Sequence, residues 1–135
     1  MPESQEHINL VKALSAWTME RFSGSFYDFY VLADLPDAVE KPDFIAGFRP
    51  DLFARAPGRL TLIGEAKTTT DLETEHTQRQ VAAFLQFLSS VPGAVFVMAT
   101  PWPAHASAQN LVGKVARQMG ITKVELRFLP QWENA

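Results

Sequence analysis

Two charged residues close a short apolar segment, and their spacing allows them to act on the same reactant. The residues before Glu65 and Lys67 in segment 59–67 are mainly apolar, which predicts a strand. Alternate side chains of a strand point to opposite faces, so Glu65 and Lys67 share one face, about 7 Å apart along the chain. The carboxylate can bind a hard cation, while the ammonium positions or polarises a nucleophilic water.

Asp51 supplies a second carboxylate. It follows Pro50 in a predicted strand over 48–54, and the turn Ala56-Pro57-Gly58-Arg59 has Pro and Gly at its central positions. We therefore expect an antiparallel hairpin that brings Asp51 close to Glu65. Two carboxylates on adjacent strands suit Mg²⁺, which takes oxygen ligands and keeps waters that leave room for a phosphate. Such an ion can activate water and stabilise charge on a scissile phosphate.

The register of this hairpin decides whether the two carboxylates share a face. A two-residue turn at Pro57-Gly58 would pair Asp51 with Gly64, and Asp51 would then face away from Glu65. We therefore predict a bulge or a longer turn that shifts the pairing by one residue. Regular pairing with the carboxylates on opposite faces would contradict a metal site.

The remaining elements must hold this hairpin in a sheet. Apolar residues recur at helical spacing over 3–21, and 35–43 is a proline-containing loop. The other elements are expected as a strand over 26–32, a helix from Thr70 or Asp71 to Ser89, a strand over 94–99, a helix over 104–119 and a strand over 122–129. This order predicts an α/β fold with a mixed sheet and helices on both faces.

Length and composition indicate one soluble domain. The 135 residues contain no repeat or long linker, so 1–135 is expected to be a single domain. The lack of cysteine excludes disulfides, thiolate metal sites and cysteine nucleophiles. No segment approaches the roughly 18 apolar residues of a membrane span, and the polar, acidic start is unlike a signal peptide. A cytoplasmic protein without membrane contact is the expectation.

The net charge of −3 differs from the positive charge typical of nucleic-acid-binding domains. Five of the twelve basic residues nevertheless fall between positions 49 and 79, mixed with acidic residues. The arginines in this window are candidates for contacts to the phosphates of a nucleic-acid backbone, which position a protein without specifying sequence. They are Arg49, Arg55, Arg59 and Arg79.

The pattern Pro50-Asp51, a gap of thirteen residues and then Glu65-Ala66-Lys67 resembles the PD-(D/E)xK motif of the restriction-endonuclease-like superfamily. The resemblance implies a three-layer α/β/α sandwich with a mixed central sheet in the order αβββαβαβ, which matches the order predicted above. Size and layout are most similar to Holliday-junction resolvases and compact restriction or repair nucleases.

Two further positions resemble features of this superfamily. In many relatives a glutamine in the next helix, followed four residues later by an aromatic residue, completes the site, and Gln80 with Phe84 resembles that pattern. Many relatives also carry a metal-linked glutamate early in the first helix. Glu6 is the best match, with Glu3 and Glu20 as alternatives.

The resemblance implies a Mg²⁺-dependent DNA endonuclease that hydrolyses phosphodiester bonds with metal-activated water, and in which Mn²⁺ can substitute. Asp51, Glu65 and Glu6 would hold the metal, Lys67 would orient water or stabilise charge, and Gln80 would support the site. A homodimer is expected, because related enzymes often dimerise to reach both strands.

The acidic net charge favours an alternative, a catalytically weak or inactive nuclease-like domain that acts as a nucleic-acid-binding or assembly module. A third hypothesis places sequence specificity on a separate specificity subunit.

Several residues also have plain structural interpretations. Glu65 and Lys67 could form a solvated strand end, and Gln80 could bond to a helix end or to water. His7 is expected at the surface. Trp102 lies in a rigid proline-flanked loop and could be an exposed contact, but burial is more usual and is the expectation.

Overall fold

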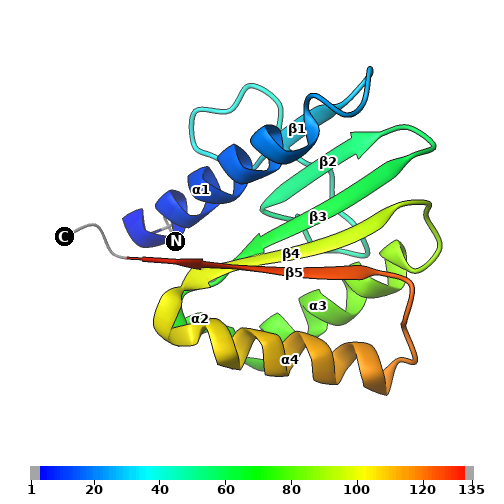
Figure 1. The fold of residues 1–135 in the computed structure, drawn as a ribbon. Helices are drawn as coiled ribbons and strands as arrows, with labels where there is room; N and C mark the ends of the chain where they lie inside the picture. The colour runs from blue at the N-terminus through cyan, green and yellow to red at the C-terminus, as the bar shows by residue number, and fades with distance from the viewer. Residues whose placement is uncertain (1–3, 133–135) are drawn as a thin grey trace.

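The computed structural model describes residues 4–132 and shows an α/β fold around a five-stranded mixed sheet. The elements are α1 (Gln5–Phe22), β1 (Tyr30–Ala33), β2 (Leu52–Ala56), β3 (Leu60–Ala66), α2 (Thr69–Leu72), α3 (Glu75–Leu88), β4 (Ala94–Pro101), the 3₁₀ turn η1 (Trp102–Ala104), α4 (His105–Gln118) and β5 (Glu125–Gln131). The strands lie in the sheet in chain order (Figure 1). β1, β2 and β3 pair antiparallel, whereas β4 pairs parallel with β3 and with β5.

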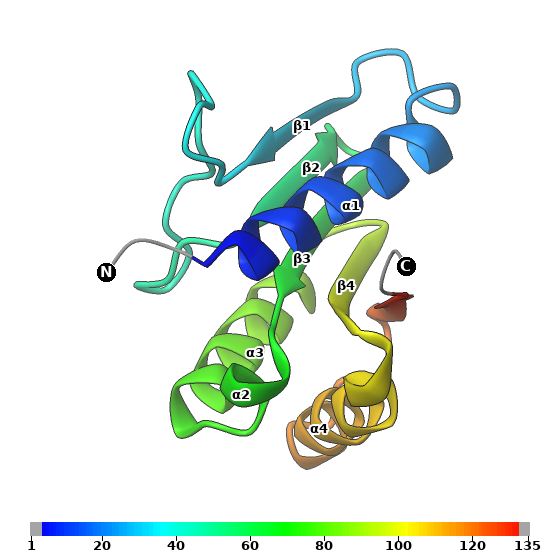
Figure 2. The same cartoon turned by 90° about the vertical axis from the view of Figure 1, so that its left-hand side faces the viewer.

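Helices cover both faces of the sheet (Figures 1 and 2). On one face α1 packs through Leu14 against a cluster that includes Leu62. On the other face Phe84 of α3 and Val112 of α4 pack with Ile63. Neighbouring residues of β3 therefore enter different cores, as strand alternation requires, and β3 is buried on both faces. Within residues 4–132, no helix combines the length and apolar character that crossing a bilayer requires.

The hairpin of β2 and β3 has the longer turn that the sequence predicted. Ala56 pairs with Leu60, so the loop contains three residues, 57–59. This extra residue shifts the register by one relative to a two-residue turn. Continuing the pairing past the end of β2 sets Asp51 opposite Glu65, on the same face of the sheet.

The prediction of one long helix from Thr70 or Asp71 to Ser89 is wrong at its start. The chain forms the short helix α2 first, and the long helix α3 begins only at Glu75. The side chain of Thr68 accepts a bond from the backbone of Asp71 and begins α2. Thr74 accepts a bond from the backbone of Thr77 and begins α3. A hydroxyl that accepts a backbone N–H favours a new helix start, so the second threonine interrupts the first helix.

Several strand bounds also differ from those expected. The strand predicted over 26–32 begins at Tyr30, because Phe26 and Phe29 pack against the apolar cluster on the α1 face instead of pairing. The strand predicted over 48–54 begins at Leu52, and Phe48 instead bridges back to Ile45 in a tight turn. The last strand, predicted over 122–129, runs over Glu125–Gln131.

Candidate functional site

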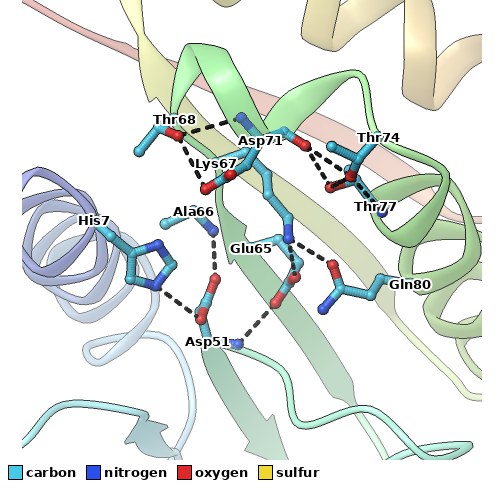
Figure 3. Close-up of polar contacts among 10 residues, drawn as sticks. All are labelled: His7, Asp51, Glu65, Ala66, Lys67, Thr68, Asp71, Thr74, Thr77 and Gln80. Carbon is cyan, nitrogen blue, oxygen red and sulfur yellow. Dashed lines mark hydrogen bonds and ion pairs between the residues drawn. The ribbon is translucent and has the colours of Figure 1, made fainter. Parts of the chain in front are cut away.

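Asp51 and Glu65 are held together at the end of the hairpin by two hydrogen bonds, each from a backbone N–H to a side-chain carboxylate (Figure 3). The backbone nitrogen of Asp51 donates to Oε2 of Glu65 at 2.8 Å, and the backbone nitrogen of Ala66 donates to Oδ2 of Asp51 at 2.8 Å. Both side chains are buried, Glu65 almost completely. The reciprocal bonds fix the two carboxylates beside each other before any ligand arrives.

Lys67 and Gln80 complete the arrangement on the same side. The backbone nitrogen of Lys67 donates to the oxygen of Ala99 at 3.0 Å, which continues the pairing of β3 with β4 and keeps Lys67 on the face of Glu65. Its Nζ lies 3.7 Å from Oε1 of Glu65 and donates to Oε1 of Gln80 at 2.5 Å. Gln80 comes from the second turn of α3 (Figure 3). The structure thus brings together the four predicted residues Asp51, Glu65, Lys67 and Gln80.

The electrostatics of Glu65 reflect this crowding. Burial raises the pKa of the Glu65 carboxyl well above its usual value, and the neighbouring carboxylate of Asp51 raises it further. Lys67 and the hydrogen bond from the Asp51 backbone lower the pKa of Glu65 but do not outweigh these effects. The protonated form of Glu65 is therefore favoured in the protein alone, and an added cation would favour its ionised form.

A residue that the sequence had placed at the surface belongs to this cluster. His7, in the first turn of α1, is half-buried, and its Nε2 lies 3.2 Å from Oδ1 of Asp51. His7 carries no local sequence signal for this role, because its contact depends on how α1 crosses the sheet.

Glu6, the predicted third metal ligand, lies elsewhere. It is exposed and lines a separate depression together with Gln131 and Trp132, beyond the ends of β4 and β5. Successive helix residues point about 100° apart, so His7 and Glu6 face different surroundings. Of the two alternatives, Glu20 is exposed near the opposite end of α1, and Glu3 lies outside the described residues.

The four arginines are spread over the molecule. Arg49 is half-buried two residues before Asp51, with its guanidinium 4.7 Å from the ring centroid of Phe44. Arg79 is exposed beside Gln80 and pairs with Glu75 at 3.7 Å. Arg55 and Arg59 are exposed at the turn end of the hairpin, and Arg59 is six residues from Glu65, roughly 20 Å along the strand. Only Arg49 and Arg79 therefore lie next to site residues in the chain.

The donor set at the hairpin end fits Mg²⁺. Asp51 and Glu65 offer carboxylate oxygens from adjacent strands, and a cation held by both would offset the repulsion from Asp51 that helps to raise the pKa of Glu65. Mg²⁺ is commonly held by one or two carboxylates and completes its shell with waters and substrate phosphate. Within residues 4–132, no group of three or more His, Cys, Asp or Glu side chains is gathered closely enough to hold a metal ion.

The arrangement can support hydrolysis of a phosphate ester. It combines two carboxylates for a hard cation with one buried ammonium that is fixed in place. Comparison with protein-family models gives no match, and comparison with curated proteins gives none either.

Proposed function

We propose that this chain is a Mg²⁺-dependent DNA endonuclease with the restriction-endonuclease-like fold, and that Asp51, Glu65, Lys67 and Gln80 form its active site. The observation that carries the proposal is the bonded pairing of Asp51 with Glu65 across a hairpin whose three-residue loop sets the register. The succession of a helix, three meander strands, helices and parallel strands also agrees with what the motif implies.

Mg²⁺ held by Asp51 and Glu65 would activate water and stabilise negative charge on the phosphate under attack. Lys67 contributes a cation on the same face, and Gln80 fixes the position of its ammonium through Oε1. A donor that is already oriented stabilises developing charge without a cost of reorganisation. Asp51 is held in turn by Ala66 and His7, so its free lone pairs keep a constant direction.

DNA contacts would come from basic residues near the site. Arg49 and Arg79 remain the candidates for backbone phosphates, because Arg55 and Arg59 lie at the turn end of the hairpin. A homodimer would allow two such sites to address both strands of a duplex.

The net charge of −3 favours one alternative, a nuclease-like domain that binds or assembles without cleaving. A separate specificity subunit, supplying DNA recognition in trans, would be consistent with the small size of the chain.

Cleavage assays on supercoiled plasmid and branched DNA test the proposal. Wild type should nick DNA with Mg²⁺ or Mn²⁺, and Lys67→Ala should lose about 100-fold or more of that rate, because the fixed cation is removed. Lys114→Ala, which removes an exposed lysine on α4, is the matched control and should retain wild-type activity.

Equal activity of wild type and Lys67→Ala would place the chemistry elsewhere. Inactivity of both with intact DNA binding would favour the binding module. Activity that appears only when a partner chain is added would identify a specificity subunit.

A further inference from the structure

Two tryptophans stack on each other at the surface, at the carboxyl ends of β4 and β5. The rings of Trp102 and Trp132 have centroids 5.0 Å apart and planes inclined by 22°. They meet because β4 and β5 are parallel and Pro101 pairs with Gln131, which sets the two following residues side by side. Trp102 is 48% exposed and Trp132 69%, so the expectation that Trp102 is buried was wrong. Together the two exposed rings present a flat aromatic surface on which another planar group could stack.

A depression of about 650 Å³ adjoins Trp132, between the start of α1 and the ends of β4 and β5. Its size is within the range of small-ligand sites. Leu10 and Pro101 contribute apolar surface, and the polar groups come from one carboxylate and two amides, those of Glu6, Asn9 and Gln131.

This depression lies at the same end of the sheet as the candidate active site. Ala66 is level with Ala99 of β4, and Pro101 is two residues further, roughly 7 Å along the strand. The first turn of α1 contributes a residue to each site, because His7 contacts Asp51 and Glu6 lines the depression. Figure 1 shows the start of α1 and the ends of β3 and β5 on the same side of the molecule.

The aromatic ring and the carboxylate of the depression suit the base of a nucleotide better than its phosphate. Tryptophan faces stack with nucleobases whatever their sequence. The carboxylate of Glu6 accepts hydrogen bonds from the amino and ring N–H groups on a base edge, but repels phosphate. Bases within a duplex are covered on both faces by their neighbours, so only an unpaired base can offer a face to Trp132.

We propose that the Trp102–Trp132 stack and its depression bind an unpaired nucleobase, and that the substrate is DNA with single-stranded nucleotides next to the cleaved bond. The inference deepens the proposed function and rests on it for the choice of DNA as the ligand. The backbone of the same strand would pass over the end of the sheet, from this depression on the α1 face to Asp51 and Glu65 on the α3 face.

Binding without metal tests this inference separately from cleavage. Fluorescence anisotropy in EDTA compares a labelled mixed-sequence single strand with the duplex formed by the same strand. Wild type should prefer the single strand, and Trp132→Ala and Trp102→Ala should each weaken that binding roughly 10-fold. Trp132→Phe should retain most of the affinity, because phenylalanine keeps a stacking face.

Tyr27→Ala is the matched control. It removes a fully exposed ring just beyond the other end of α1, an 18-residue helix about 27 Å long, and should leave single-strand affinity unchanged. Circular dichroism should show the same fold for all variants.

Equal single-strand affinity of wild type and both tryptophan-to-alanine variants would overturn the inference. So would absence of single-strand binding by wild type, or a preference for duplex. The binding assay contains no metal and does not depend on cleavage, and the Lys67→Ala cleavage assay does not depend on the tryptophans. Failure of the nucleobase site can therefore be distinguished from failure of the proposed nuclease activity.

Discussion

The backbone nitrogen of Asp51 donates to the carboxylate of Glu65 at 2.8 Å, although thirteen residues lie between them along the chain. The backbone nitrogen of the following residue, Ala66, donates a hydrogen bond of the same length to the carboxylate of Asp51. Both bonds depend on the three-residue loop between β2 and β3, because a loop shorter by one residue would turn Asp51 to the opposite face. The geometry of a distant turn therefore decides whether the two carboxylates meet.

Gly58 is the residue on which the turn depends. Its φ is 76°, a conformation that disfavours any side chain, and its added Cβ would meet no atom within 4 Å. Gly58→Ala should therefore lower the free energy of unfolding by about 1 kcal/mol through backbone strain alone. Urea denaturation measures this value. Gly24→Ala, also in open space but without a positive φ, should change it little, and an equal loss in both would contradict the strain argument.

His7→Ala should weaken metal binding about 10-fold, because partners that orient a metal-binding carboxylate contribute to affinity. Calorimetric titration with Mn²⁺ measures the dissociation constant. Glu6→Ala, at the neighbouring position, is the control. It should bind Mn²⁺ as wild type does, since Glu6 lines the depression beside Trp132. A loss confined to Glu6→Ala would restore Glu6 as a metal ligand.

Gln80→Ala should lower kcat for DNA cleavage about 10-fold and leave KM nearly unchanged. Gln80 accepts a bond from Lys67, so its loss frees the ammonium without removing a contact to DNA. Steady-state kinetics separates the two constants. Gln78→Ala, an exposed glutamine on the same helix, should match wild type. A rise in KM alone would instead assign Gln80 to substrate binding.

Glu65 should make the stability of the metal-free protein depend on pH. Its pKa is raised above 4.5 in the folded state, so folding favours its protonated form. The resulting stabilisation is complete below the unfolded pKa and is lost as the pH rises through the raised folded pKa. Relative to Glu65→Gln, wild type should therefore lose free energy of unfolding as the pH increases above 4.5.

Urea denaturation in EDTA across a series of pH values measures this difference. Parallel curves for the two proteins would show that Glu65 does not titrate in this way. Added Mg²⁺ at neutral pH should raise the Tm of wild type more than that of Glu65→Gln, because the ion binds the folded state.

Much of the site follows from local sequence pattern. Strand alternation alone places Glu65 and Lys67 on one face, and Pro57-Gly58 marks the turn that joins the two strands. The requirement that Asp51 reach Glu65 predicted the longer loop, and that prediction is confirmed. The α/β class with a mixed sheet is confirmed as well, because the spacing of apolar residues and turns determines the type and order of the elements.

Other features depend on contacts between elements that no local pattern encodes. His7 reaches Asp51, and Glu6 does not, because the rotation of α1 on the sheet selects which side of its first turn faces β2. Trp102 and Trp132 stack only because two parallel strands end level with each other. Sequence spacing therefore determined the carboxylates and lysine of the hairpin, where one chain segment sets its own geometry. Packing decided the partners that other segments bring, because their directions are fixed only when the core closes.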